Sequence, residues 1–144
     1  MTRNIRTFIA IALPIVALAL MSGTAMAQSY TGNWPVTWNV TYPGSPWVGE
    51  HTYCLTLTDD GSQGFPHSGL ATLNGSGQSN VQGIFQVINN ELAATFYLPG
   101  GYQIDPLVFV GAAGKDKIGK GFGNSPNGAA TVTGPLTFGA KGGC

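Results

Sequence analysis

The chain has 144 residues and a formal net charge of zero, and only 8% of its residues are charged against 43% that are hydrophobic. So sparse a charge excludes the basic patch that a nucleic-acid-binding face requires. The length fits one domain and is too short for two of ordinary size.

The first 27 residues predict a cleavable signal peptide. Arg3 and Arg6 form a basic start, residues 8–21 are an apolar run interrupted only by Pro14, and residues 25–27 have the small-x-small pattern of a cleavage site. The run is shorter than the roughly 17 to 25 residues that span a bilayer; an uncleaved anchor is the alternative. We therefore expect residues 28–144 to be one exported domain, periplasmic or extracellular, with no membrane span.

Removal of this peptide takes both arginines with it. The remaining domain then has a small negative charge, which gives no attraction for nucleic acid or for an anionic membrane.

Cys54 and Cys144 are the only cysteines. In an oxidising compartment an even pair predicts a disulfide. The bond would close a loop of about 90 residues and restrict the unfolded chain by roughly 4 to 5 kcal/mol in the entropic model.

Alternation of apolar and polar residues predicts β-strands along the domain. In the first strand, the apolar positions are Trp34, Val36, Trp38, Val40 and Tyr42. The second strand places Tyr53, Leu55 and Leu57 on one face and Cys54 on the other. Pro35 cannot donate a backbone hydrogen bond, so we expect it at an edge, at a bulge or beyond the paired region.

Six further strands are expected at residues 69–73, 80–88, 91–98, 106–112, 117–123 and 130–141. Turn residues separate several of them, at 59–61, 89–90 and 99–101. The inward-facing candidates are Val81, Phe85, Val87, Leu92, Ala94, Phe96, Leu98, Leu107, Phe109, Leu136 and Phe138. Eight short strands without a helical period predict an all-β fold, an eight-stranded antiparallel up-and-down β-barrel, with a sandwich as the alternative.

Gly32-Asn33-Trp34, at the start of the first strand, resembles the Gly-x-Trp signature of the calycin superfamily, which includes lipocalins, avidins and bacterial metalloprotease inhibitors. The resemblance implies a small barrel in which a basic residue near the last strand packs across the signature tryptophan. Lys141 stands at the matching place for Trp34. Strand parity puts Lys141 opposite Phe138, so this contact requires a bulge, expected at Gly139. Folds of this type host carriers, inhibitors and enzymes, so the resemblance supports the architecture alone.

Large aromatic residues inside such a barrel are candidates for ligand binding. Trp38, Tyr53, Phe85, Phe96 and Phe109 are expected to point inward, where an eight-stranded barrel either encloses one small ligand or is filled by side chains. The first hypothesis is therefore a binding protein for a small apolar or aromatic molecule.

Two loops carry candidate recognition residues, Trp47 in one and Phe65 and His67 in the other. Large apolar side chains in loops mark surfaces that bind partners. The second hypothesis is a module, such as a protease inhibitor, that binds another exported protein through these loops. In the alternative reading, Trp47 and Phe65 fold back over the barrel end.

No catalytic motif, metal-ligand spacing or cofactor fingerprint is present, so we expect no enzyme activity, no metal and no cofactor. The few titratable candidates for a site assembled by folding are Glu50, His51, His67 and Asp105. Lys115, Lys117 and Lys120 indicate a solvated hairpin, with contact to an acidic partner as the alternative. A structural role in an envelope or an extracellular assembly is the third hypothesis.

Overall fold

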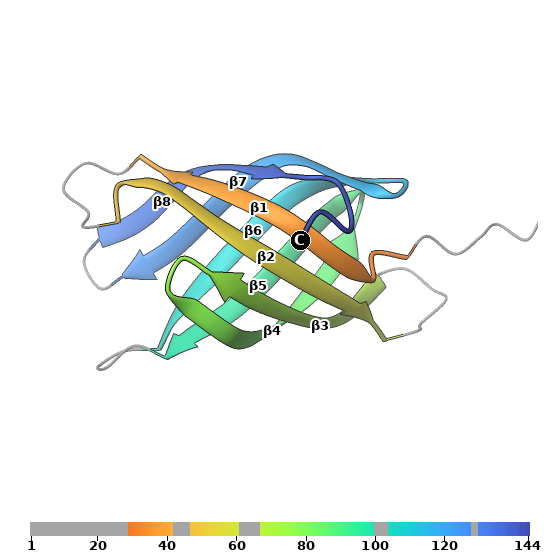
Figure 1. Cartoon of the computed structure of the whole chain (residues 1–144), viewed down its shortest axis with the longest axis horizontal. Coiled ribbons are helices and arrows are strands. Elements are labelled where there is room, and N and C mark those ends of the chain that lie inside the picture. Colours follow the sequence, from red (N-terminus) through yellow and green to blue (C-terminus); the bar gives the residue numbers. More distant parts are fainter. Residues whose placement is uncertain (1–28, 42–46, 61–66, 100–103, 128–129) are drawn as a thin grey trace, which may run out of the picture.

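Eight strands follow one another along the chain in this computed structural model, which describes residues 29–41, 47–60, 67–99, 104–127 and 130–144. They are β1 (Gly32–Val40), β2 (Gly49–Asp59), β3 (His67–Gly75), β4 (Gln78–Ile88), β5 (Glu91–Pro99), β6 (Ile104–Gly114), β7 (Lys117–Asn127) and β8 (Ala130–Phe138). Each pairs antiparallel with the next, and β8 pairs back with β1, so the sheet closes into a barrel (Figure 1). The predicted up-and-down barrel is confirmed and the sandwich is excluded.

The observed strands are on the whole longer than the sequence pattern indicated. β2 begins at Gly49 and β7 continues to Asn127, because polar residues and glycines that interrupt the apolar alternation still pair with their neighbours. The last strand is the exception: it ends at Phe138, not at residue 141. Tyr42 and Gly61, expected in the first strand and the first turn, lie outside the described residues.

The interior of the barrel is built from the residues whose alternation predicted it. Every inward candidate whose side chain is described is buried, and Trp34, Leu55, Leu57, Leu92, Ala94, Phe96 and Phe109 have no solvent exposure. The side chain of Leu98 is not described. Residues of all eight strands contribute to this single apolar core.

The strand directions define two ends of the barrel. At one end of the barrel, β1 begins and β2 ends. Tyr30, which precedes β1 in the chain, is buried there, and we call this the Tyr30 end. β1 ends and β2 begins at the other, beside Trp47, which we call the Trp47 end. The hairpin between β3 and β4 also lies at the Trp47 end, whereas the hairpins of residues 89–90 and 115–116 lie at the Tyr30 end (Figure 1).

The closure between β1 and β8 explains the position of Pro35. β8 pairs with residues 36–38 of β1, and Pro35 is the next residue beyond them. Its carbonyl accepts a hydrogen bond from the Gly139 N–H at 2.7 Å, but it has no N–H to return. Pro35 thus lies where the pairing with β8 stops, as expected, although on its other side it pairs with Cys54 of β2.

Beyond β8 the C-terminal tail, residues 139–144, turns across the outside of β1. The Gly142 N–H donates to the Asn33 carbonyl, and Cys144 reaches Cys54 on the outer face of β2. The two cysteines form the predicted disulfide, with their Cα atoms 5.9 Å apart. The bond therefore fastens the end of the chain over the line where the barrel closes.

Candidate functional site

Four of the predicted interior aromatic residues pack together in the middle of the barrel. The ring of Phe109 lies 5.8 Å from Trp38, 5.8 Å from Tyr53 and 6.0 Å from Phe96, measured between centroids. Phe85 is buried on β4, where it is paired with Ala94 of β5. The five residues share the interior, and their own side chains occupy its centre.

A row of rings continues from this cluster to the Trp47 end. His51, the partner of Trp38 in the β1–β2 ladder, has its ring 6.2 Å from Trp38 and 5.6 Å from Trp47. Its Nε2 lies 2.7 Å from the backbone carbonyl oxygen of Trp47. Trp47 is partly buried and packs against the core. The alternative in which Trp47 folds back over the barrel end therefore agrees with its position.

The indole of Trp38 has an unsatisfied polar atom among the described residues. Its side chain is 2% exposed, and its Nε1–H has no hydrogen-bond partner in that part of the chain. The same atom of Trp34, four residues earlier on the same face, donates to the Tyr30 carbonyl at 2.9 Å. A buried donor without a partner costs about 1 to 3 kcal/mol, so the Trp38 indole is an energetic exception within the core.

The wall opposite the Trp38 N–H is made of small residues of β7. A Cβ atom placed on Gly123 would lie 2.5 Å from Trp38 Nε1, so only glycine fits beside the indole. Ser125, the next inward position toward the Trp47 end, is buried as well. The sequence pattern did not reveal this arrangement, because it shows neither which strands oppose each other nor which polar atoms remain unpaired.

Tyr53 and the β3–β4 hairpin lie beside the same end of the barrel. Burial raises the pKa of the Tyr53 phenol above its ordinary value, and a hydrogen bond with the Ser76 side chain offsets part of that shift. The Ser76 hydroxyl also donates to the Thr52 carbonyl and accepts from the Thr52 N–H. Tyr53 is therefore held neutral, in contact with both the aromatic cluster and a fixed hairpin.

The Tyr30 end has the contact that the calycin resemblance implied. Lys141 Nζ lies 5.9 Å from the centroid of the Trp34 ring and donates to the Ser29 carbonyl at 3.1 Å. The expected bulge at Gly139 is absent: β8 ends at Phe138, and a turn closed by a hydrogen bond from the Gly143 N–H to the Ala140 carbonyl brings Lys141 into place. Gly32 has a φ of +143°, and a Cβ there would lie 2.7 Å from the Lys141 side chain, so both features require glycine.

The predicted recognition residues do not share one surface. His67 opens β3 at the Tyr30 end, buried, with its Nδ1 3.5 Å from Asp59 Oδ2 and its ring 5.9 Å from Tyr30. Trp47 lies at the opposite end, and Phe65 falls outside the described residues. Trp47 and His67 therefore lie at opposite ends of the barrel and do not form a single recognition surface.

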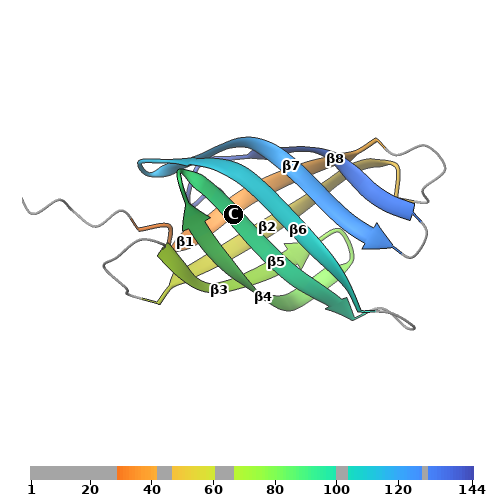
Figure 2. The ribbon, with the colours of Figure 1, turned by 180° about the vertical axis from the view of Figure 1, so that it is seen from behind.

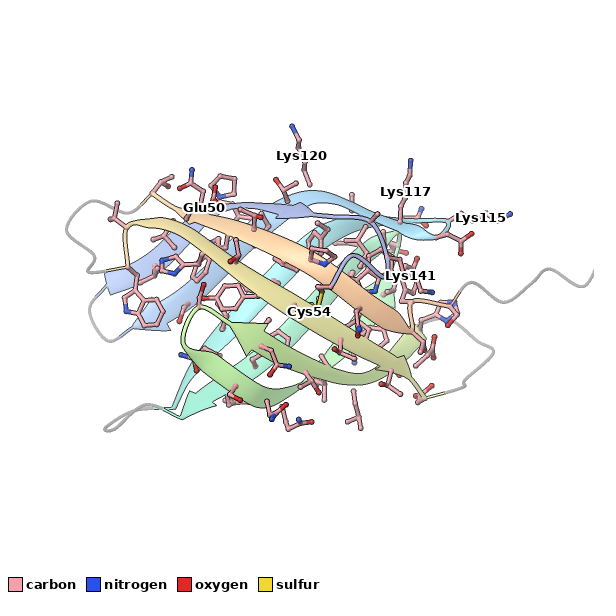
Figure 3. The ribbon with its side chains drawn as sticks, in the orientation of Figure 1. Glu50, Cys54, Lys115, Lys117, Lys120 and Lys141 are labelled. Atoms are coloured by element: carbon pink, nitrogen blue, oxygen red, sulfur yellow. A yellow bond between two sulfur atoms is a disulfide. The ribbon has the colours of Figure 1, made fainter. Side chains whose placement is uncertain are left out.

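The titratable candidates are dispersed as well. His51 lies near the start of β2, at the Trp47 end of the barrel, whereas His67 begins β3 at the Tyr30 end. Glu50 is exposed on β2, and the side chain of Asp105 is not described. Within the described ranges, no group of three or more His, Cys, Asp or Glu residues is placed to hold a metal ion. Lys117 and Lys120 project outward from β7, and Lys115 from the hairpin before it, as Figure 3 shows.

No helix in the described part of the chain is long and apolar enough to cross a membrane. No protein-family model matches the chain, and neither a curated protein nor a solved structure shows significant similarity to it.

Proposed function

We propose that the protein is an exported binding protein of calycin-like architecture, which takes up a small aromatic molecule at the Trp47 end of its barrel. The buried N–H of Trp38, for which the described residues offer no hydrogen-bond acceptor, carries this proposal. A ligand that enters from the Trp47 end and carries a hydrogen-bond acceptor would satisfy that donor, and the new hydrogen bond would stabilise the complex. The indole would then both stack on the ligand and orient it.

The packing favours the Trp47 end over the centre of the barrel. Phe109 and its three ring neighbours fill the middle with the protein's own side chains, so a ligand there would have to displace them. Trp38, His51 and Trp47 instead form a row that leads outward. A flat ring would lie against these residues after displacing Trp47, which packs against the core and whose backbone carbonyl contacts His51.

The placement of Trp47 also favours a small molecule over a protein partner. An anchor for a protein interface projects from the surface into the partner, whereas Trp47 is packed against its own core. In this proposal Trp47 acts as a lid that opens for the ligand. Both the loss of water from the site and the aromatic contacts then contribute to binding.

The first experiment looks for the ligand directly. Native mass spectrometry of protein purified from its own host should show a bound mass, or uptake from a panel of indole, benzoate and a flavone, with a saturated fatty acid as the non-aromatic contrast. The chain has three tryptophans, so its side-chain N–H resonances can be followed singly by NMR of isotope-labelled protein. Binding should shift the Trp38 N–H downfield and leave the already bonded Trp34 N–H in place.

Variants then assign the contact. Trp38→Phe keeps a ring but removes the donor, and should weaken binding by roughly 3- to 10-fold, as expected for one hydrogen bond. Tyr97→Phe removes a hydroxyl from the exposed outer wall and serves as the matched control, with unchanged affinity. A protein that carries no bound mass, takes up none of the probes and keeps its Trp38 resonance unmoved would refute the proposal.

A further inference from the structure

The outer wall of the barrel carries a row of uncharged residues that the core does not explain. Leu70, Ile84, Thr95 and Val108 are direct partners across β3, β4, β5 and β6, so they lie side by side. All four point away from the core, and Leu70 and Ile84 are 61% and 56% exposed. Two large aliphatic side chains in direct cross-strand contact thus face solvent.

A second row continues this surface onto β7. Ala93, Val110 and Phe122 are direct partners on β5, β6 and β7, and Phe122 is 50% exposed. Tyr97, which follows Thr95 on the outward side of β5, is 60% exposed. We call the seven residues of the two rows, together with Tyr97, the outer apolar band: Leu70, Ile84, Thr95, Val108, Ala93, Val110, Phe122 and Tyr97. Figure 2 views the barrel from the side on which β4 to β7 lie next to one another.

The outer apolar band is free of charge. None of its eight residues is acidic or basic. The exposed Glu91, two residues before Ala93 on β5, and the exposed Lys120, two residues before Phe122 on β7, flank one border of the band. Gln82 and Gln86, which flank Ile84 on its own strand, are neutral. Contiguous exposed apolar surface of this kind marks an interaction site in soluble proteins.

We infer that the outer apolar band is the interface of a homodimer, occupied by the same band of a second copy of this chain. A two-fold dimer sets one patch against its own copy, so any charge in the patch would meet its like across the axis. This band has none to repel its copy. None of its eight residues is a lysine or an arginine with which a protein would bind lipid headgroups or an acidic partner, and the single flanking lysine, Lys120, lies outside the band.

The area agrees with a reversible dimer. Four large side chains of the band, those of Leu70, Ile84, Tyr97 and Phe122, are half to three-fifths exposed and present roughly 400 Å² of apolar surface. Their neutral neighbours, including Gln82 and Gln86, extend the contact toward the roughly 800 Å² per partner of a standard interface. We therefore expect a dissociation constant on the order of micromolar. The band lies on the wall of the barrel, so dimerisation would leave the Trp47 end accessible and does not depend on the ligand proposal.

Sedimentation equilibrium of the purified protein, from about 1 to 500 µM, tests this inference. The mass should rise from monomer to dimer, and added sodium chloride should not weaken the association, because no ion pairs hold it. Ile84→Lys should raise the dissociation constant at least tenfold. Asn39→Lys, which puts the same charge on an exposed position of the opposite wall, should leave it unchanged. Circular dichroism checks the fold of both variants, and Leu70→Gln replaces Ile84→Lys if that variant does not fold.

Three results would overturn the inference. One is a monomer at every concentration, and another is a dimer that responds to the Asn39 variant but not to the Ile84 variant. The third is a monomer that binds neutral phosphatidylcholine vesicles and loses this binding in Ile84→Lys, which would show that the band contacts a membrane surface. Ligand uptake is measured separately, so failure of the dimer and failure of the proposed function are distinguishable.

Discussion

Loss of the Cys54–Cys144 disulfide should destabilise the barrel by an amount that follows from the chain length it encloses. The cysteines are 90 residues apart, so the bond restricts most of the unfolded domain. The loop-closure relation gives about 4 to 5 kcal/mol for a loop of this size, as an upper value when the folded barrel is unchanged. At an ordinary denaturant dependence for a small domain, this corresponds to a fall of roughly 2 to 3 M in the urea midpoint.

Urea unfolding of three proteins separates the covalent link from the contacts of the tail. Cys54→Ser/Cys144→Ser lacks the bond and keeps the tail, whereas Lys141→Ala keeps the bond and loses the contact with Trp34. The third protein is the wild type, measured with and without reductant. Reduction should reproduce the double variant and exceed the effect of Lys141→Ala severalfold. A loss below about 1 kcal/mol in both the reduced protein and the double variant would refute loop closure as the source of stability.

Three further substitutions test single contacts. Lys141→Met should lower the free energy of unfolding by about 0.5 to 1 kcal/mol in urea titrations, because an exposed cation over an aromatic ring contributes about that much. Lys141→Arg keeps the cation and should have the stability of the wild type. An equal loss of stability in both variants would contradict a stabilising contact between Lys141 and Trp34. Gly123→Ala should cost about 1 to 3 kcal/mol by overlap with the Trp38 indole, while Gly119→Ala, whose new Cβ would have its nearest neighbour at 3.5 Å, should be close to wild type in the same assay. Because the pKa of Tyr53 is raised, its neutral form is favoured in the fold; the resulting stability is complete below about pH 10 and is lost as pH rises through the folded pKa. Alkaline unfolding followed by tyrosinate absorbance should therefore move to higher pH in Tyr53→Phe, and an unchanged profile would contradict the assignment.

Much of the fold could be predicted from local patterns, because a closed up-and-down barrel pairs neighbours in the sequence. Alternation placed Trp38 and Phe109 inside and Cys54 outside, and the structure agrees. The disulfide also followed from two cysteines and an expected oxidising compartment. These features depend on strand parity and on composition, which a single sequence displays directly.

The features that escaped prediction depend on positions far apart in the chain. A turn after Phe138 brings Lys141 to Trp34, because the missing N–H of Pro35 ends the pairing there and lets the tail leave the sheet. Parity alone suggested a bulge instead. Burial of Tyr30 and His67 at the same end likewise follows from the closure of the barrel, which brings together segments that carry no local signal.

Trp34 and Trp38 provide an internal comparison that bears on function. They are the same residue type, on one strand and one face, and both are buried in the same core. The fold gives the Trp34 N–H a partner in Tyr30, and the segment that supplies it is fastened further by Lys141. Beside the Trp38 indole the fold places Gly123 instead, and the Trp38 N–H has no hydrogen-bond partner among the described residues. A phenylalanine at position 38 would avoid this cost, so packing alone does not account for the indole. Each unsatisfied buried polar group in a native structure calls for an explanation, and a functional role is one of them, so the difference between the two tryptophans supports the proposal of a ligand site at the Trp47 end.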